Sequence, residues 1–355
     1  MAQVLIIGGG LAGLSCALRL LQQGQEVTVV EKQRGSIDRV CGEGVLPFGV
    51  VLLEELGLAE QVAQKGYLFD GVDWVHGEQR IEGRFSDGRH GMGIERAQLD
   101  AMLKETCNQF AGFTLKQGHN QKPGSTAGFD YVLAADGIRS SWGKAAGKRV
   151  IFGKRIGLRF RLQAARPQRV TVHFFHNLEI YLTPVGHQAL SVAVLIDAHK
   201  LNLRGGQLKN YCRDFFRTNF PQYSTLPIDD MATRAPISSR IKGTEPKLHL
   251  LGDALCAFDP ISGAGMSFAL LCGKYAAENL EDVGAYYRSL RPARAAVAGF
   301  TRAQLLFRGG GIKTRLMFRQ LALADCFNRI LALHNGRNRI TDLNSRTLLS
   351  LLRPF

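Results

Sequence analysis

The sequence lacks any long apolar run. No continuous stretch among its 355 residues approaches the roughly 18 apolar residues that a membrane-spanning helix needs. A strand pattern starts at Gln3, and this leaves no room for the basic and apolar regions of a signal peptide. The apolar content of 45% is ordinary for a folded protein. These features predict a globular protein of the cytoplasm rather than an integral membrane protein.

Paired cysteines and metal-ligand motifs are also missing. The seven cysteines form no CxxC pair and show no Cys/His spacing of the kind that binds zinc; they are Cys16, Cys41, Cys107, Cys212, Cys256, Cys272 and Cys326. Their odd number and wide scatter argue against a disulfide framework. We predict reduced, packed thiols and no metal site.

Acidic residues are scarce towards the C-terminus. From residue 291 onward only Asp325 and Asp342 oppose twelve basic residues, which places +10 of the net charge of +15 in the last 65 residues. Basic regions of this kind bind an anionic membrane surface, bind an acidic carrier protein, or form a helical face that is simply solvated. These alternatives stay open from the sequence, so peripheral membrane contact is one expectation. We expect no nucleic-acid partner.

The chain opens with the pattern of a dinucleotide-binding unit. An apolar strand at residues 3–7 runs directly into Gly-Gly-Gly-Leu-Ala-Gly at residues 8–13, a helical pattern follows, and a second strand at residues 26–30 ends on Glu31. A strand, a GxGxxG turn, a helix and a second strand with an acid at its tip form the βαβ unit that binds a pyrophosphate.

Each position of this unit has a physical reason. The first glycine of the motif allows a tight turn, the second lets the backbone approach the pyrophosphate, and the last lets the helix pack on the sheet. The helix N-terminus offers free N–H groups to the anion, and the acid accepts hydrogen bonds from ribose hydroxyls. The predicted contacts of this half of the site are Gly8, Gly10, Leu11, Ala12, Gly13, Glu31 and Lys32.

Beyond this unit the periodicity of apolar residues changes along the chain. The predicted elements are a helix at 50–57, a strand-rich stretch at 68–94, a helix from Arg96, a buried strand at 129–137, period-two strands at 155–200, a buried strand at 247–253, and helices from about 264 with a hinge at 309–311. The period-two strands indicate an antiparallel sheet with one covered face.

Three further stretches resemble one flavoprotein superfamily. Residues 129–141 (FDYVLAADGIRSS) resemble its "DG" motif, residues 248–265 (LHLLGDALCAFDPISGAG) resemble its "GD" motif, and Arg96 with Leu99 and Asp100 resembles its RxxLD helix start. The superfamily is that of the FAD-dependent aromatic hydroxylases, which are like p-hydroxybenzoate hydroxylase, and it includes a geranylgeranyl reductase branch. The resemblance covers most of residues 1–290, in the right order and spacing.

The resemblance implies a fold and a division of the chain. The fold class is α/β, with a Rossmann-type, glutathione-reductase-like FAD-binding domain interleaved with an antiparallel β-sheet substrate domain and followed by a helical C-terminus. The segments implied are 1–70, 96–150 and 245–290 for the FAD-binding domain, 71–95 and 151–244 for the substrate-binding sheet, and 291–355 for the basic helical region.

The same motifs locate the flavin half of the site. A carboxylate at the end of a buried strand needs donors, and the hydroxyls of a ribityl chain supply them. A proline-glycine turn can lie close to a flat ring, and a helix dipole behind it would stabilise negative charge on a reduced flavin. The predicted contacts here are Arg39, Arg96, Asp136, Gly137, Gly252, Asp253, Pro260, Gly263, Gly265 and Met266.

The loop at residues 39–47 leaves the reaction open. Gly44-Val45-Leu46 resembles the hydroxylase pattern, which implies a monooxygenase acting through a flavin C4a-hydroperoxide, whereas Cys41-Gly42-Glu43-Gly44 resembles the CGxG loop of the reductase branch. In the reductase reading Cys41 and Tyr181 are the candidate proton donors, and an isoprenoid or another unsaturated lipid is the substrate. A membrane-associated flavin electron carrier is a third hypothesis. A halogenase is not favoured, because the sequence has no GxxWxxIP stretch.

The reductant and the substrate follow from two further observations. There is no second GxGxxG motif, so we expect no separate NAD(P)H domain. The expected reductant is NAD(P)H that binds transiently, and another electron donor is the alternative. The strands of the antiparallel sheet carry few fixed charges, which predicts a hydrophobic small-molecule substrate. The residues expected to line its site are Phe160, Phe174, Phe175, Ile180 and Leu182.

Overall fold

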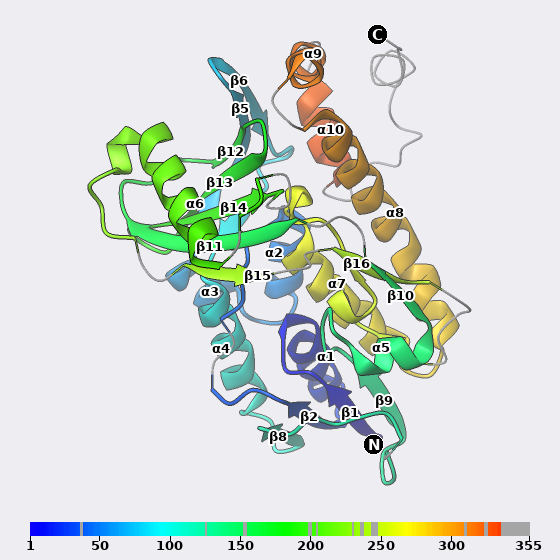
Figure 1. The fold of residues 1–355 in the computed structure, drawn as a ribbon. Coiled ribbons are helices and arrows are strands. Elements are labelled where there is room, and N and C mark those ends of the chain that lie inside the picture. The colour runs from blue at the N-terminus through cyan, green and yellow to red at the C-terminus, as the bar shows by residue number, and fades with distance from the viewer. Residues whose placement is uncertain are drawn as a thin grey trace.

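The structure is a computed structural model that describes residues 1–35, 38–124, 126–151, 155–197, 201–203, 205–228, 231–234, 238–242, 248–308, 311–322 and 326–334. These residues form a parallel sheet with packed helices, a larger antiparallel sheet, and a helical C-terminal part that runs alongside both (Figure 1). The fold class expected from the sequence is confirmed. The expected hinge at 309–311 lies largely outside the described residues, as do residues 335–355 of the basic region.

The first domain is built on a five-stranded parallel sheet. Its strand order is β17 (His249–Leu250), β9 (Tyr131–Ala134), β1 (Gln3–Ile7), β2 (Glu26–Glu31) and β8 (Phe113–Gln117). Since parallel strands end at the same edge of a sheet, the turns that follow β1, β9 and β17 meet there. This topology brings the glycine turn, the Asp136-Gly137 turn and Gly252 together although they are far apart in the sequence.

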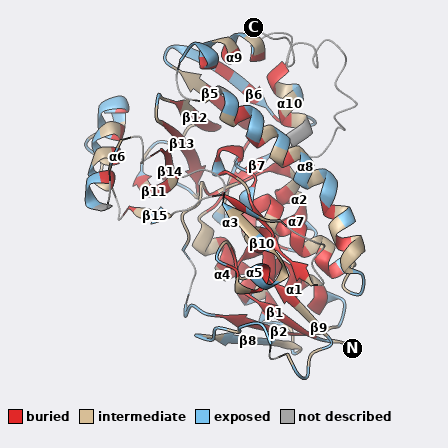
Figure 2. Cartoon of the chain, turned by 45° about the vertical axis from the view of Figure 1, so that its right-hand side comes forward, coloured by how far each residue is buried: buried red, intermediate tan, exposed pale blue. Residues whose placement is uncertain are grey.

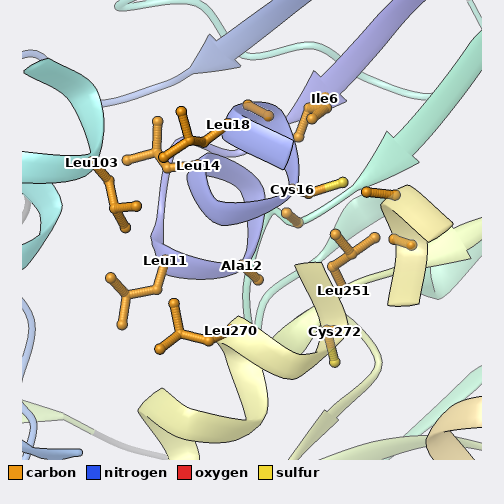
Figure 3. Packing of buried hydrophobic residues seen from close by; sticks show 14 of the residues in the cluster. Ile6, Leu11, Ala12, Leu14, Cys16, Leu18, Leu103, Leu251, Leu270 and Cys272 are labelled. Carbon is orange, nitrogen blue, oxygen red and sulfur yellow. The ribbon is translucent and has the colours of Figure 1, made fainter. Parts of the chain in front are cut away.

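Helix α1 (Leu11–Gln22) forms the centre of this domain's core. Ten of its twelve residues are buried, and it packs against α7 (Gly265–Glu278) and α4 (Arg96–Cys107). In Figure 3, Leu14 lies toward Leu103 of α4 and Leu11 lies toward Leu270 of α7. The apolar spacing of α1 therefore fixes both helices that carry site residues.

Short elements surround the site. A small sheet joins β3 (Gly44–Val45), β7 (Gly91–Gly93) and β4 (Tyr67–Phe69), next to α2 (Pro47–Glu54) and α3 (Ala59–Lys65). A second small sheet joins β10 (Lys148–Ile151), β16 (Ser239–Lys242) and β18 (Cys256–Ala257), beside α5 (Ser141–Ala146). The 3₁₀ helices η2 (Gly252–Ala254) and η3 (Pro260–Ser262) lie on either side of β18 along the chain.

The second domain is a seven-stranded sheet. Its order is β15 (Ala232–Arg234), β11 (Ile156–Gln163), β14 (Ala189–Ile196), β13 (Leu178–Val185), β12 (Val170–Phe174), β5 (Gly71–His76) and β6 (Gln79–Arg84). All neighbours pair antiparallel except β12 and β5. Helix α6 (Gly205–Asn219) with η1 (Pro221–Tyr223) covers one face, and its outer side is exposed (Figure 2).

The two faces of this sheet correct one expectation from the sequence. Phe160, Ile180 and Leu182 pack under α6 with Phe216, and Phe175 packs against the same cluster. Their neighbours in the strands point to the other face, because side chains alternate along a strand. The prediction that these four residues line the substrate site is therefore wrong. Phe174 lies on the opposite face from them, in a cluster with Trp74.

The C-terminal helices cover that opposite face. They are α8 (Val283–Phe307), α9 (Ile312–Leu321) and α10 (Cys326–His334). Phe318 of α9 and Phe327 and Leu331 of α10 join the cluster with Trp74, and Figure 1 shows both helices beside β5 and β6. Among the described residues, no helix combines the length and apolar character needed to cross a membrane.

We expect the α1–α7 contact to be sensitive to a single methyl group. A Cβ at Gly273 would lie 2.2 Å from Ser15 Oγ and 2.8 Å from Cys16 N. Gly273→Ala should therefore destabilise the fold by about 1–3 kcal/mol through overpacking. In α8, a Cβ at Gly299 meets nothing within 4 Å, so Gly299→Ala should be neutral or stabilise by about 0.5–1 kcal/mol. Thermal unfolding of both variants checks this, and equal melting temperatures would contradict it.

Candidate functional site

One continuous cavity connects the two domains. Its lining begins at the N-terminus of α1, passes the loop at residues 39–44 and the start of α4, and reaches the turns before α7. It then continues between the strands β5, β12, β13 and β14 and the helices α8 and α10. Twelve of the residues predicted to bind cofactor line it: Gly10, Leu11, Ala12, Arg39, Arg96, Gly137, Gly252, Asp253, Pro260, Gly263, Gly265 and Met266.

The glycine turn provides one end of this cavity. Gly8 and Gly13 serve packing, since a Cβ at Gly8 would lie 2.3 Å from the Ala135 carbonyl oxygen and one at Gly13 would lie 2.0 Å from the Gly8 oxygen. Gly10 faces the cavity instead, and a Cβ there would meet only the guanidinium groups of Arg96 and Arg39, at 3.7 and 3.9 Å. The turn therefore exposes its backbone to the cavity beside two cations.

These two arginines create a site for an anion. Burial and the neighbouring charge of Arg96 lower the pKa of Arg39, and within the described residues Arg39 has no hydrogen bond or ion pair. The first N–H groups of α1 have no partner in the helix and carry its positive dipole end. Two guanidinium groups at a helix N-terminus fit a pyrophosphate.

Arg96 is held in place from two sides. Its Nε donates to Asp100 Oδ1 at 3.2 Å, one turn along α4, and its backbone N donates to Glu43 Oε1 at 3.0 Å. Asp100 is fully buried, and burial raises the pKa of its carboxyl despite the nearby arginines. The structure thus gives the RxxLD pattern a physical meaning, because the acid orients the arginine.

The acid at the end of β2 is tied to the backbone. Glu31 is buried, and its Oε2 accepts from Gly9 N at 2.8 Å while its Oε1 accepts from Gln33 N at 2.9 Å. Each oxygen keeps a lone pair for a ribose hydroxyl. Lys32 is exposed and does not line the cavity. The roles predicted for both residues stay predictions.

The Asp136-Gly137 turn has a structural and a cavity-facing part. Asp136 Oδ2 accepts from Ser141 N at 2.9 Å at the start of α5, while its Oδ1 is buried without a hydrogen-bond partner in the described structure. Gly137, at a φ of 78°, lies against Arg39, since a Cβ there would be 3.3 Å from Arg39 Nη1. A side chain at this position would displace the arginine.

The turns before α7 form the middle of the cavity. Gly263 has a φ of 66°, and a Cβ at Gly263 or Gly265 would meet nothing within 4 Å. Asp259 caps η3 by accepting from Ile261 N at 3.1 Å. The two glycines therefore present bare backbone to open space, which a flat ring system can approach, with the N-terminus of α7 directly behind.

Asp253 has a protein partner that the sequence did not indicate. Arg234 of β15 donates to its Oδ2 at 2.7 Å. The Asp253 carboxylate therefore already has a donor from the protein, besides the ribityl hydroxyls expected from the sequence. Arg234 also lines the cavity. Arg149 donates to the carbonyl oxygens of Asp253 and Ala254, and these bonds fix the backbone of η2.

Glu43 is a second residue that sequence reasoning missed. It is 0% exposed and has a φ of 57°, which is rare for a residue with a side chain. Arg161 of β11 pairs with it through Nε at 3.0 Å and through Nη2. The only signal in the sequence was an acid between two glycines. Glu43 ties the loop at residues 39–44 to the antiparallel sheet.

The two proposed proton donors both line the cavity. Burial raises the pKa of the Cys41 thiol, and its sulfur accepts from Glu43 N at 3.3 Å. Burial also raises the pKa of Tyr181, whose hydroxyl donates to the Ile261 carbonyl oxygen at 2.8 Å. Both groups are therefore weak acids, and the tyrosine proton already has an acceptor.

The far half of the cavity is a chamber without charge. The residues that line it are Leu46, Phe69, Val72, Trp74, Val170, Val172, Tyr181, Thr183, Ala193, Leu195, Phe258, Ile261, Phe300, Gln304 and Leu331. None is ionised at neutral pH, since Tyr181 keeps its proton. The charged lining residues lie elsewhere in the lining: Arg39 and Glu43 in the loop at 39–44, Arg96 at the start of α4, Asp253 in η2, and Arg234 at the end of β15, paired with Asp253. No cluster of metal-ligating side chains is found in the described part of the chain.

Comparisons with known proteins agree with this arrangement. Residues 1–122 match the family described as FAD binding domain. The chain is 27% identical over 312 residues to digeranylgeranylglycerophospholipid reductase of Thermoplasma acidophilum, covering 78% of this chain and 76% of the relative. Two solved structures share its fold. The flavin-dependent brominase Bmp2 has a TM-score of 0.81 at 19% identity, covering 94% and 93% of the two chains. The p-nitrophenol 4-monooxygenase PnpA of Pseudomonas putida has a TM-score of 0.78 at 16% identity, covering 96% and 99%.

The fold and the site are those of an FAD-binding protein. Residues 1–122 match the family model described as FAD binding domain, and the described residues share their fold with the brominase Bmp2 and the monooxygenase PnpA. The residues present fit FAD, because the glycine turn with Arg39 and Arg96 suits the pyrophosphate and the open backbone at Gly263 and Gly265 suits the ring. The FAD expected from the sequence is thus supported.

We expect Arg39 to contribute strongly to FAD affinity. Arg39→Met removes one of two cations at the glycine turn and should weaken FAD binding about 10- to 100-fold, the range for hydrogen bonds to charged groups. Titration of the apoprotein, followed by flavin fluorescence, measures this. The exposed Arg288, which pairs with Asp282 and does not line the cavity, provides the control, and Arg288→Met should bind FAD as the wild type does. Equal affinities for all three proteins would rule out the assigned role.

Proposed function

We propose that this chain is a FAD-dependent monooxygenase that hydroxylates a neutral apolar or aromatic molecule, with NAD(P)H as its transient reductant. The observation that carries the proposal is that the turn at residues 260–265 and the uncharged chamber belong to one cavity. FAD bound there would supply two-electron redox chemistry and reaction with oxygen. An apolar chamber next to it keeps water away from the reacting atoms.

The chain's own residues bind and orient rather than exchange protons in this proposal. Arg39 and Arg96 hold the anionic end, and the N-terminus of α7 stabilises negative charge near the turn by about 0.3–1 kcal/mol. Aromatic side chains such as Trp74 and Phe300 confine a substrate in the chamber. Hydroxylation of this kind needs no dedicated acid or base from the protein.

The reductase alternative rests on the likeness to the Thermoplasma reductase and on the Cys41-Gly42-Glu43-Gly44 loop. It needs a group that supplies a proton when hydride adds to a double bond. Cys41 and Tyr181 are the candidates, and burial makes each a weaker acid. This favours the monooxygenase. A simple electron carrier is favoured less, since it needs no enclosed substrate chamber.

Reaction of the reduced protein with oxygen separates these functions. We expect stopped-flow mixing of the FAD-loaded, reduced protein with O2 to give a transient absorbance band distinct from those of reduced and oxidised flavin. The enclosed chamber should make this band persist longer than it does with free flavin, because water is excluded. A direct return to oxidised flavin, with and without apolar aromatic compounds present, would count against the monooxygenase.

A substitution of Cys41 tests the reductase alternative. If Cys41 donates the proton, Cys41→Ser should slow the reduction of an isoprenoid double bond by about 100- to 10,000-fold, as expected for loss of a general acid. Unchanged turnover would remove Cys41 from that role.

We also propose that the surface between α8 and α9 contacts an anionic membrane. Residues 291–321 contain seven basic and no acidic residues. Leu306, near the end of α8, and Ile312, the first residue of α9, are 70% and 75% exposed. Lys313 and Arg315 of α9 are exposed as well. Apolar side chains surrounded by cations favour the interface of an anionic bilayer. Helices α8 and α10 also line the chamber. In this proposal an apolar substrate would pass from the membrane to the chamber along these helices.

Vesicle sedimentation tests this surface. We expect the protein to bind phosphatidylglycerol vesicles but not phosphatidylcholine vesicles, and Ile312→Glu to weaken binding about tenfold or more by removing a buried apolar contact. Ile151, which is 57% exposed on β10, supplies the control, and Ile151→Glu should bind like the wild type. If anionic vesicles do not bind, the basic surface is left to an acidic carrier protein or to solvent, and the proposal fails.

A further inference from the structure

A buried arginine lies beside the turn that presents bare backbone to the cavity. Arg155, which directly precedes β11, is 2% exposed. Its Nη1 donates to Asp259 Oδ1 at 2.7 Å, and its Nη2 pairs with Glu179 of β13, which is buried as well. Burial lowers the pKa of this arginine, and the charge of Asp259 counteracts that effect. Charges this far from water are screened little, so they act strongly on their surroundings.

Asp259 connects this arginine to the turn at residues 260–265. The residues on either side of it in the chain line the cavity, and its Oδ1 also accepts from Ile261 N at 3.1 Å. The Ile261 carbonyl oxygen accepts from the Tyr181 hydroxyl at 2.8 Å. Both backbone polar groups of Ile261 are therefore held, one of them through the carboxylate that Arg155 fixes. These bonds set the position of the turn relative to the antiparallel sheet.

The pair belongs to a larger network of charges. Glu179 also lies 3.8 Å from Arg308, which caps the C-terminus of α8 and pairs with Asp197 beside the end of β14 at 2.9 Å. Helix α8 itself packs against η3. Replacing buried ion pairs by apolar side chains is often neutral or stabilising, so stability alone does not account for such a network. Its place next to the turn indicates a role in the FAD site.

We propose that the Arg155–Asp259 pair sets the reduction potential of bound FAD, with Arg155 as the positioning residue that fixes the turn at residues 260–265 through Asp259. The inference rests on the assignment of this turn to the flavin ring. It deepens the proposed function, since the potential governs both reduction by NAD(P)H and the later reaction with oxygen. Negative charge develops on a flavin during reduction, so a nearby carboxylate opposes reduction and a nearby guanidinium favours it.

Potentiometry of the FAD-loaded protein, without oxygen or substrate, tests the pair. Asp259→Asn keeps an oxygen for Ile261 N but removes the negative charge. It should raise the midpoint potential by about 30 mV, which is about tenfold in the equilibrium constant for two-electron reduction. Arg155→Met removes the positive charge and should lower the potential by a similar amount. In the double variant the two changes cancel, so its potential should be close to that of the wild type.

A second capping aspartate provides the control. Asp282 caps α8 by accepting from Ala285 N at 2.8 Å and pairs with Arg288, but both side chains of this pair are exposed and neither lines the cavity. Asp282→Asn should leave the potential unchanged, because solvent screens its charge. Hydrogen exchange of the apoprotein adds a readout without FAD. Arg155→Met should speed exchange of the Ile261 backbone N–H, and Asp282→Asn should not.

Two results would overturn the inference. One is a shift of the potential in the same direction in both single variants, as a merely structural disturbance of the turn would give. The other is an Asp259→Asn variant with the potential of the wild type. If Arg155→Met does not fold, the double variant decides, because a potential equal to that of Asp259→Asn would show that Arg155 has no effect on the flavin.

The outcome is independent of the oxygen experiment, because no measurement here involves oxygen or turnover. Loss of the oxygen transient together with opposite shifts in the potential would remove the monooxygenase and keep the Arg155–Asp259 pair as the group that sets the potential.

Discussion

The buried carboxylate of Glu43 is the contact on which both halves of the cavity depend. It accepts from the backbone of Arg96 in the FAD-binding domain and pairs with Arg161 in the antiparallel sheet. Removing one partner from a buried charge pair costs about 3–5 kcal/mol, because the other charge is left uncompensated. The loop at residues 39–44, which carries Arg39 and Cys41, is therefore fixed relative to two sheets at once. This explains how a residue can keep the rare φ of 57°: the surrounding bonds determine it.

Glu43 also helps to position the charged groups at the glycine turn. Arg39 and Arg96 lie together at the glycine turn, and an anion bound there would relieve the repulsion between their charges. Asp100 and Glu43 hold Arg96, whereas nothing in the described structure holds Arg39. Of these two arginines, we therefore expect Arg39 to contribute less to the stability of the fold and more to the binding of an anion.

The sequence predicted the first domain well because its signals are local. A glycine turn between two apolar strands, and an acid at the tip of the second, are visible within the first 31 residues, and parallel topology then brings distant strand ends to one edge. The chamber could not be predicted in this way. Which face of β13 is covered by α6 depends on long-range packing, so Ile180 and Leu182 were assigned to the wrong face although the strand itself was recognised. Gln304 gave no signal, because a glutamine in a long amphipathic helix is ordinarily solvated.

The chemistry that the chamber can support follows from how its polar groups are already used. A reductase must supply a proton beside the ring, yet the Tyr181 hydroxyl is donated to a backbone carbonyl and the Cys41 thiol is a weaker acid than usual. A monooxygenase needs a dry chamber, which the apolar walls provide. Burial is responsible for both properties: it weakens the acids and keeps water out of the chamber. The physical character of this chamber thus favours positioning of a substrate over proton transfer to it.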